Sequence, residues 1–325
     1  MQSPIIHHEL LLSRHVSSVG LDPAVLRRSC ARGELVRLRP GAYVLTSTWA
    51  AAGVDERHRL RIRAAAAASR TPVVVSHVSA AVLHGMPLVG APPAHVHVLV
   101  PPAGGSRHEH GFVKHARIHS WDAQVEAGGL LLTPLAVALV DVCLTESFTR
   151  SVVMTDHALR ADAVTLAELV DEFASRGTRR GARRVEAVVA FASPLADRPL
   201  ESVSRVGMRL LGLPDPELQH EFRQSDRHLA TVDFWWPDVG AVGEADGDLK
   251  YSDPVFLAGR TPAQVVIDEK KREGAVRRLD EVTSFVRWDW ATALDVERLG
   301  ARLAAAGLRP QRRPWTGEFV WTGRS

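Results

Sequence analysis

The chain has little cysteine, little lysine and no long apolar run. Cys30 and Cys143 are its only cysteines among 325 residues, too few for the disulfide framework of a small secreted domain. The longest apolar candidate, 130–144, contains a proline and an aspartate, so no membrane span is expected. The first residues show no basic segment ahead of an apolar one, so we expect no secretory signal. These absences predict a protein of the reducing cytoplasm, with no membrane partner.

Lysine is rare although the chain is basic. Of 40 basic residues four are lysines, and three of these, Lys250, Lys270 and Lys271, fall in one short segment. A cation that is retained as lysine in such an arginine-rich chain is more informative than usual. The net charge of +3 permits binding to nucleic acid but does not by itself argue for it.

The first fifty residues predict two helices followed by a β-hairpin. We expect helices over 8–16 and 24–32, the second opened by Asp22-Pro23, and strands over 35–39 and 42–45 around Pro40-Gly41. This order is that of a winged helix-turn-helix domain over 1–50. Its arginines are candidate contacts to DNA phosphates and bases, with a solvated helix face as the alternative: Arg27, Arg28, Arg32, Arg37 and Arg39.

The segment 55–192 alternates helical and extended stretches and predicts a mixed α/β middle domain. We expect strands over 72–76 and 95–100 and helices over 57–69, 79–84, 134–143, 147–161, 166–175 and 182–191. Within it, several histidines crowd the stretch SRHEHGFVKHARIHSW. Histidine and glutamate can bind zinc or manganese, but the spacing matches no helical or finger pattern. A polar loop entering a strand accounts for these residues without a metal: His108, Glu109, His110, His115 and His119.

Two phrases, RRSCARGELVRLRPGAYVL from Arg27 and SHVSAAVLHGMPLVG from Ser76, resemble AbiEi-type antitoxins. The resemblance covers roughly residues 5–160 and implies a DNA-binding regulator of a bacterial defence or toxin-antitoxin operon. It implies a cognate toxin or defence-system protein as a partner besides DNA, and no catalysis by these domains.

The block 199–292 concentrates acidic residues in the element order α-β-β-β-α-β. Asp233 is expected to end one strand and Glu244 to lie in the next, so a hairpin would place their carboxylates side by side, with Asp246 on the face of Glu244. Such carboxylates need a cation, and Mg²⁺ or Mn²⁺ suits oxygen ligands. Lys250 or Lys270 could then stabilise charge on a scissile phosphate. Surface acids around a βαβ-like unit are the alternative.

The phrases VDFWWPD, GEADGDLKY and EKKREGAVRRLDEVTSFVRWDW resemble the PD-(D/E)XK nucleases, particularly the very short patch repair endonucleases. The resemblance assigns Asp233 and Glu244 to the metal-binding pair and Glu201 to the acid of the first helix. It places Glu269 and Lys270 on the helix flanking the site. One departure stands out, because Asp246 occupies the position where an E-x-K lysine is expected.

The sequence thus predicts an α/β multidomain protein with an N-terminal winged helix, a mixed α/β middle domain and a restriction-endonuclease-like α/β/α domain. A poorly ordered tail is expected over 308–325. The expected function is metal-dependent cleavage of DNA, targeted by the winged helix, in defence or repair. The alternative is a DNA-binding regulator or antitoxin whose nuclease-like domain is inactive.

Overall fold

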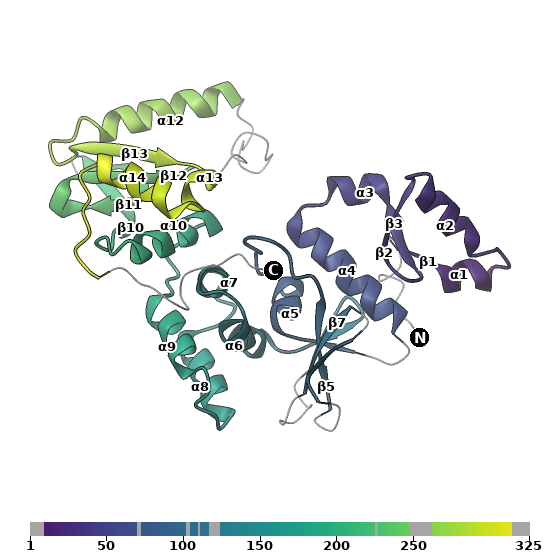
Figure 1. Ribbon diagram of the computed structural model, residues 1–325. Coiled ribbons are helices and arrows are strands. Elements are labelled where there is room, and N and C mark those ends of the chain that lie inside the picture. The colour runs from purple at the N-terminus through teal and green to yellow at the C-terminus, as the bar shows by residue number, and fades with distance from the viewer. Residues whose placement is uncertain are drawn as a thin grey trace. The chain divides into compact units, whose positions relative to one another are not determined.

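A computed structural model describes most of the chain, and the mixed α/β class is confirmed by its helices and three β-sheets (Figure 1). The described residues are 10–69, 73–101, 105–109, 111–116, 124–224, 227–246 and 262–313, without the side chains of 262, 263 and 265–268. They form two compact units. The N-terminal unit runs to Ala158 and includes Asp162–Phe191, and the C-terminal unit comprises Leu159–Ala161 and the chain from Ala192.

The N-terminal unit opens with a short strand, two helices and a β-hairpin. The second helix and both hairpin strands lie where the sequence predicts them, but the predicted first helix is displaced. Leu10 and Leu12 are buried while Leu11 is exposed, and this alternation forms a strand that pairs with the hairpin before any helix begins. The elements are β1 (Leu11–Leu12), α1 (Ser13–Ser18), α2 (Ala24–Ala31), β2 (Leu35–Arg39) and β3 (Ala42–Leu45), in the sheet order β1-β3-β2.

Two helices follow the hairpin, α3 (Thr46–Ala51) and α4 (Val54–Ala68). Small and aliphatic residues of α4 pack against the hairpin, with Leu60 and Ala64 in one core cluster with Ala42 and Val44. Alanine has a high helix propensity and no side-chain entropy to lose. The alanine-rich α4 therefore forms a close-packed support for the sheet.

The middle of the chain forms a six-stranded mixed sheet. Only two of its strands, near 72–76 and 95–100, are predicted from the sequence. The others are mostly three residues long, too short for a readable alternation. In sheet order the strands are β6 (Arg107–Glu109), β7 (Phe112–Ala116), β5 (Val96–Val100), β4 (Val74–Val75), β9 (Leu130–Leu132) and β8 (Val125–Ala127).

Five helices accompany this sheet, and each lies within a few residues of its predicted range. Their apolar side chains join the strands in a shared core that includes Val78, Val98, Leu139 and Met154. The helix α8 begins with a capping box, in which Thr165 and Glu168 satisfy each other's backbone amides. The helices are α5 (His77–Leu83), α6 (Leu135–Thr145), α7 (Phe148–Arg160), α8 (Leu166–Ser175) and α9 (Ala182–Phe191).

The C-terminal unit has the predicted order α-β-β-β-α-β. Strands β10, β11 and β12 are antiparallel, and β13 joins β12 in parallel after a helical crossover. Val276 of the crossover helix packs with Val232 and Val242 on one face, while Trp288 Nε1 donates to Ser204 Oγ of α10. The elements are α10 (Pro199–Leu210), β10 (Glu217–Gln224), β11 (Arg227–Trp236), β12 (Ala241–Ala245), α12 (Pro262–Val276) and β13 (Ser284–Trp288).

Helices α13 (Trp290–Ala293) and α14 (Val296–Ala305) extend this unit beyond the last strand. The first residues of the predicted tail are packed: Leu308 is buried, and the backbone amides of Gln311 and Arg312 donate to Gly212 O. An apolar anchor after α14 explains this difference from the sequence expectation. The rest of the predicted tail, 314–325, lies outside the described residues. Among the described helices, none is long and apolar enough to cross a membrane.

Candidate functional site

Three carboxylates converge beside β12 in the C-terminal unit. Glu244 lies in β12, Asp246 is the first residue after this strand, and Glu269 lies in α12. One carboxylate oxygen of each lies within 4.8 Å of the others. The Glu244 side chain is only 3% exposed. Buried carboxylates repel one another and need positive charge nearby. This group could hold a metal ion, and it includes two of the three residues predicted as ligands.

Asp233, the third predicted ligand, lies beside this group without belonging to it. It is not at the end of β11 as expected, because the strand continues to Trp236. Phe234 of β11 pairs with Gly243 of β12 in the antiparallel register. Extending this register by one residue places Asp233 opposite Glu244. Asp233 Oδ2 accepts a hydrogen bond of 2.8 Å from the Ala245 amide. This bond fixes the carboxylate against the end of β12.

Glu201, the acid of the first helix, is buried behind Asp233. Its Oε2 accepts hydrogen bonds from the Asp197 amide at 2.8 Å and from Gln219 Nε2 at 3.0 Å. Burial, and then the charge of Asp233, raises the pKa of Glu201 to about 8. Glu201 is therefore mostly protonated at neutral pH. Gln219 has a positive φ of 50°, a conformation that non-glycine residues seldom adopt and that often accompanies functional sites.

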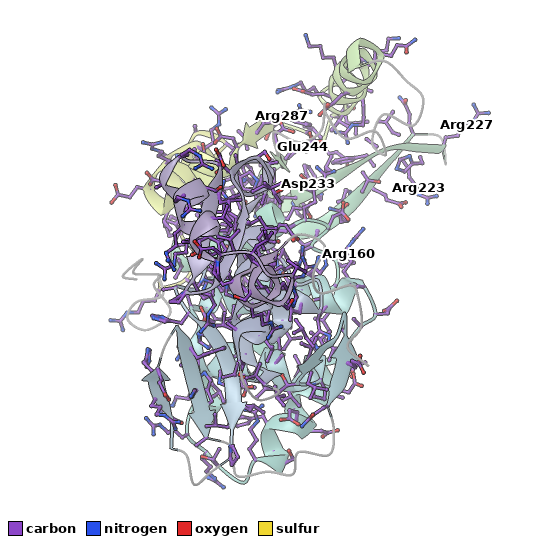
Figure 2. All side chains as sticks on the ribbon, turned by 90° about the vertical axis from the view of Figure 1, so that its right-hand side faces the viewer. Arg160, Arg223, Arg227, Asp233, Glu244 and Arg287 are labelled. Atoms are coloured by element: carbon purple, nitrogen blue, oxygen red, sulfur yellow. The ribbon has the colours of Figure 1, made fainter. Side chains whose placement is uncertain are left out.

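Two arginines supply the positive charge of this site. Arg287 of β13 contacts Glu244 at 2.7 Å, Glu269 at 3.1 Å, Asp246 at 3.3 Å and Glu273 at 3.4 Å. Parallel pairing sets this contact, because Arg287 is the register partner of Glu244. Figure 2 shows Asp233, Glu244 and Arg287 in one region.

Arg272 of α12 completes the neutralisation of Glu244. One of its guanidinium nitrogens lies 2.7 Å from Glu244 Oε1, and the other donates to the backbone oxygen of Thr231 at 2.7 Å. Burial alone would lower the pKa of Arg287, but the surrounding carboxylates, led by Glu244, raise it above its ordinary value. Arg287 is thus firmly cationic, and each of the two oxygens of Glu244 contacts a guanidinium group.

The donor set fits a hard cation, since Mg²⁺ prefers carboxylate oxygens. A cation at Glu244, Asp246 and Glu269 would share these oxygens with Arg287. When bound, the cation would place positive charge next to a phosphate oxygen and would lower the pKa of a bound water. The arginine side chains of the site can neutralise a phosphate but cannot take up a proton, because a guanidinium group is already protonated.

The structure describes one of the two predicted lysines. Lys250 lies outside the described residues, and Lys270 is exposed on α12 next to Glu269. Sequence reasoning missed Arg272 and Arg287 because it looked for a lysine. A signal for Arg287 was present, since it is the only charged residue in the strand SFVRW, and a charge inside an apolar strand needs a buried partner.

The five arginines predicted to bind DNA do not share one environment. Arg27, Arg28, Arg32 and Arg37 are exposed; Arg32 forms a 2.6 Å ion pair with Glu34, and Arg28 a looser one with Asp22. Arg39 is different, because it is half-buried with its guanidinium 5.0 Å from the centre of the Phe112 ring. Burial lowers the pKa of Arg39. Its guanidinium thus lies over a ring of the six-stranded sheet.

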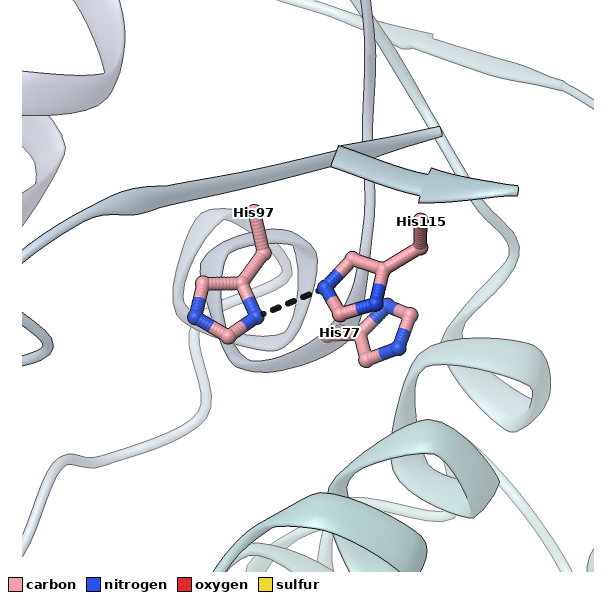
Figure 3. A group of neighbouring side chains, drawn as sticks. All are labelled: His77, His97 and His115. Atoms are coloured by element: carbon pink, nitrogen blue, oxygen red, sulfur yellow. Dashed lines mark hydrogen bonds between the residues drawn. The ribbon is translucent and has the colours of Figure 1, made fainter. Parts of the chain in front are cut away.

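A second group of possible ligands lies in the N-terminal unit (Figure 3). One ring nitrogen each of His77, His97 and His115 lies within 4.8 Å of the others. Burial, followed by neighbouring histidine charge, lowers the pKa of His97 to about 3 and that of His115 to about 4. Both rings are neutral at physiological pH. Of the histidine stretch noted in the sequence, this group contains His115.

Comparison with known proteins gives the chain relatives but no function. No protein-family model matches it. Two proteins of Mycobacterium tuberculosis, from strains CDC 1551 and H37Rv, are each 27% identical to it over 175 residues, and both are described as uncharacterized. The match covers 50% of this chain and 64% of each relative, so the chain spans less than two thirds of their length. The chain is thus similar to proteins whose descriptions state no activity.

Proposed function

We propose that the C-terminal unit is a PD-(D/E)XK-like endonuclease that hydrolyses DNA phosphodiester bonds with Mg²⁺ or Mn²⁺. The observation that carries the proposal is the convergence of Glu244, Asp246 and Glu269 within 4.8 Å, beside Asp233 and the buried Glu201. A set of acids from a helix, two adjacent strands and the crossover helix is costly to bury. A reaction that requires a bound cation would account for the free-energy cost of burying these carboxylates.

In this proposal Glu244, Asp246 and Glu269 hold the cation, and Asp233 stays fixed by the Ala245 amide. Glu201 acts as a positioning residue. It holds a proton at neutral pH because its pKa is about 8, which limits the negative charge next to Asp233.

The arginines take the place of the missing E-x-K lysine. Arg287 and Arg272 lie at the acids, where they can stabilise charge that develops on a phosphate. Because arginine does not titrate, we assign them electrostatic stabilisation and not proton transfer.

DNA would be held by exposed arginines of both units. The N-terminal unit, which we propose to be a winged helix, presents Arg27, Arg28 and Arg37. In the C-terminal unit Arg223 and Arg227 are exposed on β10 and β11 near the connection of these strands (Figure 2). Phosphate contacts of this kind position a protein on DNA without reading its sequence.

One observation favours a second candidate, a DNA-binding regulator or antitoxin with an inactive nuclease-like domain and a toxin as partner. Both oxygens of Glu244 are already paired with arginine, at 2.7 Å each, and Asp246 stands at the lysine position of the family. Internal ion pairs of this strength can replace a metal and leave a purely structural site.

A nicking assay separates the two candidates. Supercoiled plasmid, linear duplex and single-stranded DNA are incubated with the full chain and Mg²⁺, Mn²⁺ or a chelator. The endonuclease predicts cleavage that requires the cation and is abolished in Glu244→Gln, but retained in Glu281→Gln, an exposed glutamate of the same unit. Absent cleavage on every form, with DNA binding intact, refutes the endonuclease and favours the regulator. Cleavage that persists in the chelator refutes the cation site instead.

A further inference from the structure

The histidine group of the N-terminal unit brings together three ring systems from separate elements. His77 begins α5, His97 lies in β5 and His115 in β7. Strands β5 and β7 are parallel neighbours in which His97 pairs with Val113, so His115, two residues further, lies on the same face. The packing is close: His97 Nδ1 is 3.1 Å from His115 Nε2, and the rings of His77 and His115 stack with centroids 3.5 Å apart.

We propose that His77, His97 and His115 bind one Zn²⁺ ion. Zinc in proteins takes nitrogen ligands at about 2.0–2.1 Å in a tetrahedral arrangement, which sets neighbouring ligand nitrogens roughly 3.3 Å apart. His97 Nδ1 and His115 Nε2 form a hydrogen bond of 3.1 Å (Figure 3), a separation close to that spacing, and a bound ion would take the place of the shared proton. Three histidine ligands leave the fourth position to water or a small anion.

The surroundings of His77 supply a second, independent observation. Its Nδ1 lies 3.3 Å from Asp141 Oδ2 and 3.0 Å from Ser76 Oγ, and Asp141 is itself anchored by Arg176 at 2.6 Å. A carboxylate that accepts the Nδ1 proton fixes the ring and leaves Nε2 to the metal, an arrangement common to zinc-binding histidines. Asp141 is thus a positioning residue.

The backbone at His77 points the same way. Its φ of 53° lies in the left-handed region, which residues other than glycine seldom adopt. Such a conformation persists where the surroundings require it. Here it is found at the residue that stacks on His115 and contacts Asp141.

Cobalt spectroscopy and zinc stoichiometry test the site. The metal-free full chain is titrated with Co²⁺ and then Zn²⁺. We expect one equivalent of Co²⁺, with the intense visible bands of a four-coordinate ion, displaced by Zn²⁺. These bands should disappear in His97→Ala and His115→Gln and persist in His108→Ala, an exposed histidine of the neighbouring strand β6. Asp141→Asn should weaken affinity about 10- to 100-fold.

X-ray absorption of the zinc-loaded wild-type chain gives a readout that does not depend on variants that might not fold. Three imidazole ligands are expected, at about 2.0–2.1 Å. Any other number of imidazoles, failure of the wild type to bind Co²⁺ or Zn²⁺, or unchanged bands in folded His97→Ala and His115→Gln overturns the proposal. The site is independent of the proposed nuclease, so each can fail alone.

Discussion

Replacing Arg287 with alanine removes the central cation of the acidic site. Its side chain, 25% exposed, contacts four carboxylates, and the Glu244 side chain among them is 3% exposed. Loss of one partner from a buried ion pair typically costs about 3–5 kcal/mol, because the other charge stays buried without compensation. Arg272 remains at 2.7 Å from Glu244, so we expect the lower end of that range, about 3 kcal/mol.

Bound cation should restore part of this loss. Without Arg287, the oxygens of Glu244, Asp246 and Glu269 are available to Mg²⁺, and a ligand at 100 times its dissociation constant stabilises the folded state by about 2.7 kcal/mol. The wild type should gain less, because there the cation competes with the Arg287 contacts.

Urea unfolding measures both effects. Trp235, Trp236 and Trp288 are buried in this unit, so their fluorescence reports its unfolding with and without Mg²⁺. Arg298→Ala is the control, since that side chain is 70% exposed and pairs with Asp295 on the surface. It should change stability by less than about 0.5 kcal/mol. An Arg287→Ala chain as stable as the wild type refutes the electrostatic argument. A loss that Mg²⁺ does not reduce refutes the cation site.

Three further expectations concern other parts of the chain. The pKa of Glu201 is about 4.3 in the unfolded state and about 8 in the folded state. Between these two pH values the folded state binds one more proton than the unfolded state, so the unfolding free energy should fall as pH rises through that window. Glu201→Gln should remove this slope and raise stability above pH 8 by up to roughly 5 kcal/mol. If Arg28 and Arg37 contact phosphates, replacing both with alanine should lower the slope of log affinity against log salt by about 2 in DNA-binding titrations. Gly243→Ala should destabilise the C-terminal unit by about 1–3 kcal/mol in urea unfolding, because its Cβ would lie 2.7 Å from the Trp288 ring.

Each of these has a contrary outcome. A pH profile shared by Glu201→Gln and the wild type would show that this carboxyl titrates normally. A salt slope that the Arg28 and Arg37 substitutions leave unchanged would assign the N-terminal helix and hairpin to another partner. Full stability of Gly243→Ala would show that the tryptophan ring moves aside at little cost.

Local patterns predicted most of the C-terminal fold and part of its site. The position of acidic residues in apolar strands pointed to Asp233 and Glu244 as neighbouring carboxylates. Strand alternation correctly placed Asp246 beside Glu244. Pairing between distant strands was not readable in the same way. The contact between Glu244 and Arg287 joins residues 43 positions apart, and it follows from parallel register, which no local periodicity encodes.

The N-terminal arginines show a different limit of sequence reasoning. Arg39 of the predicted wing packs over Phe112, a residue of the six-stranded sheet, and no local pattern in the sequence indicates this contact. The histidine prediction has the same limit, because it considered the residues of one continuous stretch of sequence. The group in the structure combines His115 with His77 and His97 from two other elements. Tertiary packing selected these partners.

The parallel pairing of β12 with β13 also bears on how the protein is made. Glu244 leaves the ribosome 43 residues before Arg287, which at synthesis rates of about 5–20 residues per second is roughly 2–9 s. During that interval the nascent acidic strand lacks the main charge that permits its burial. Docking of β13 should therefore be a late step, and a nascent chain arrested before residue 284 should remain sensitive to proteases and bound by chaperones across β11 and β12.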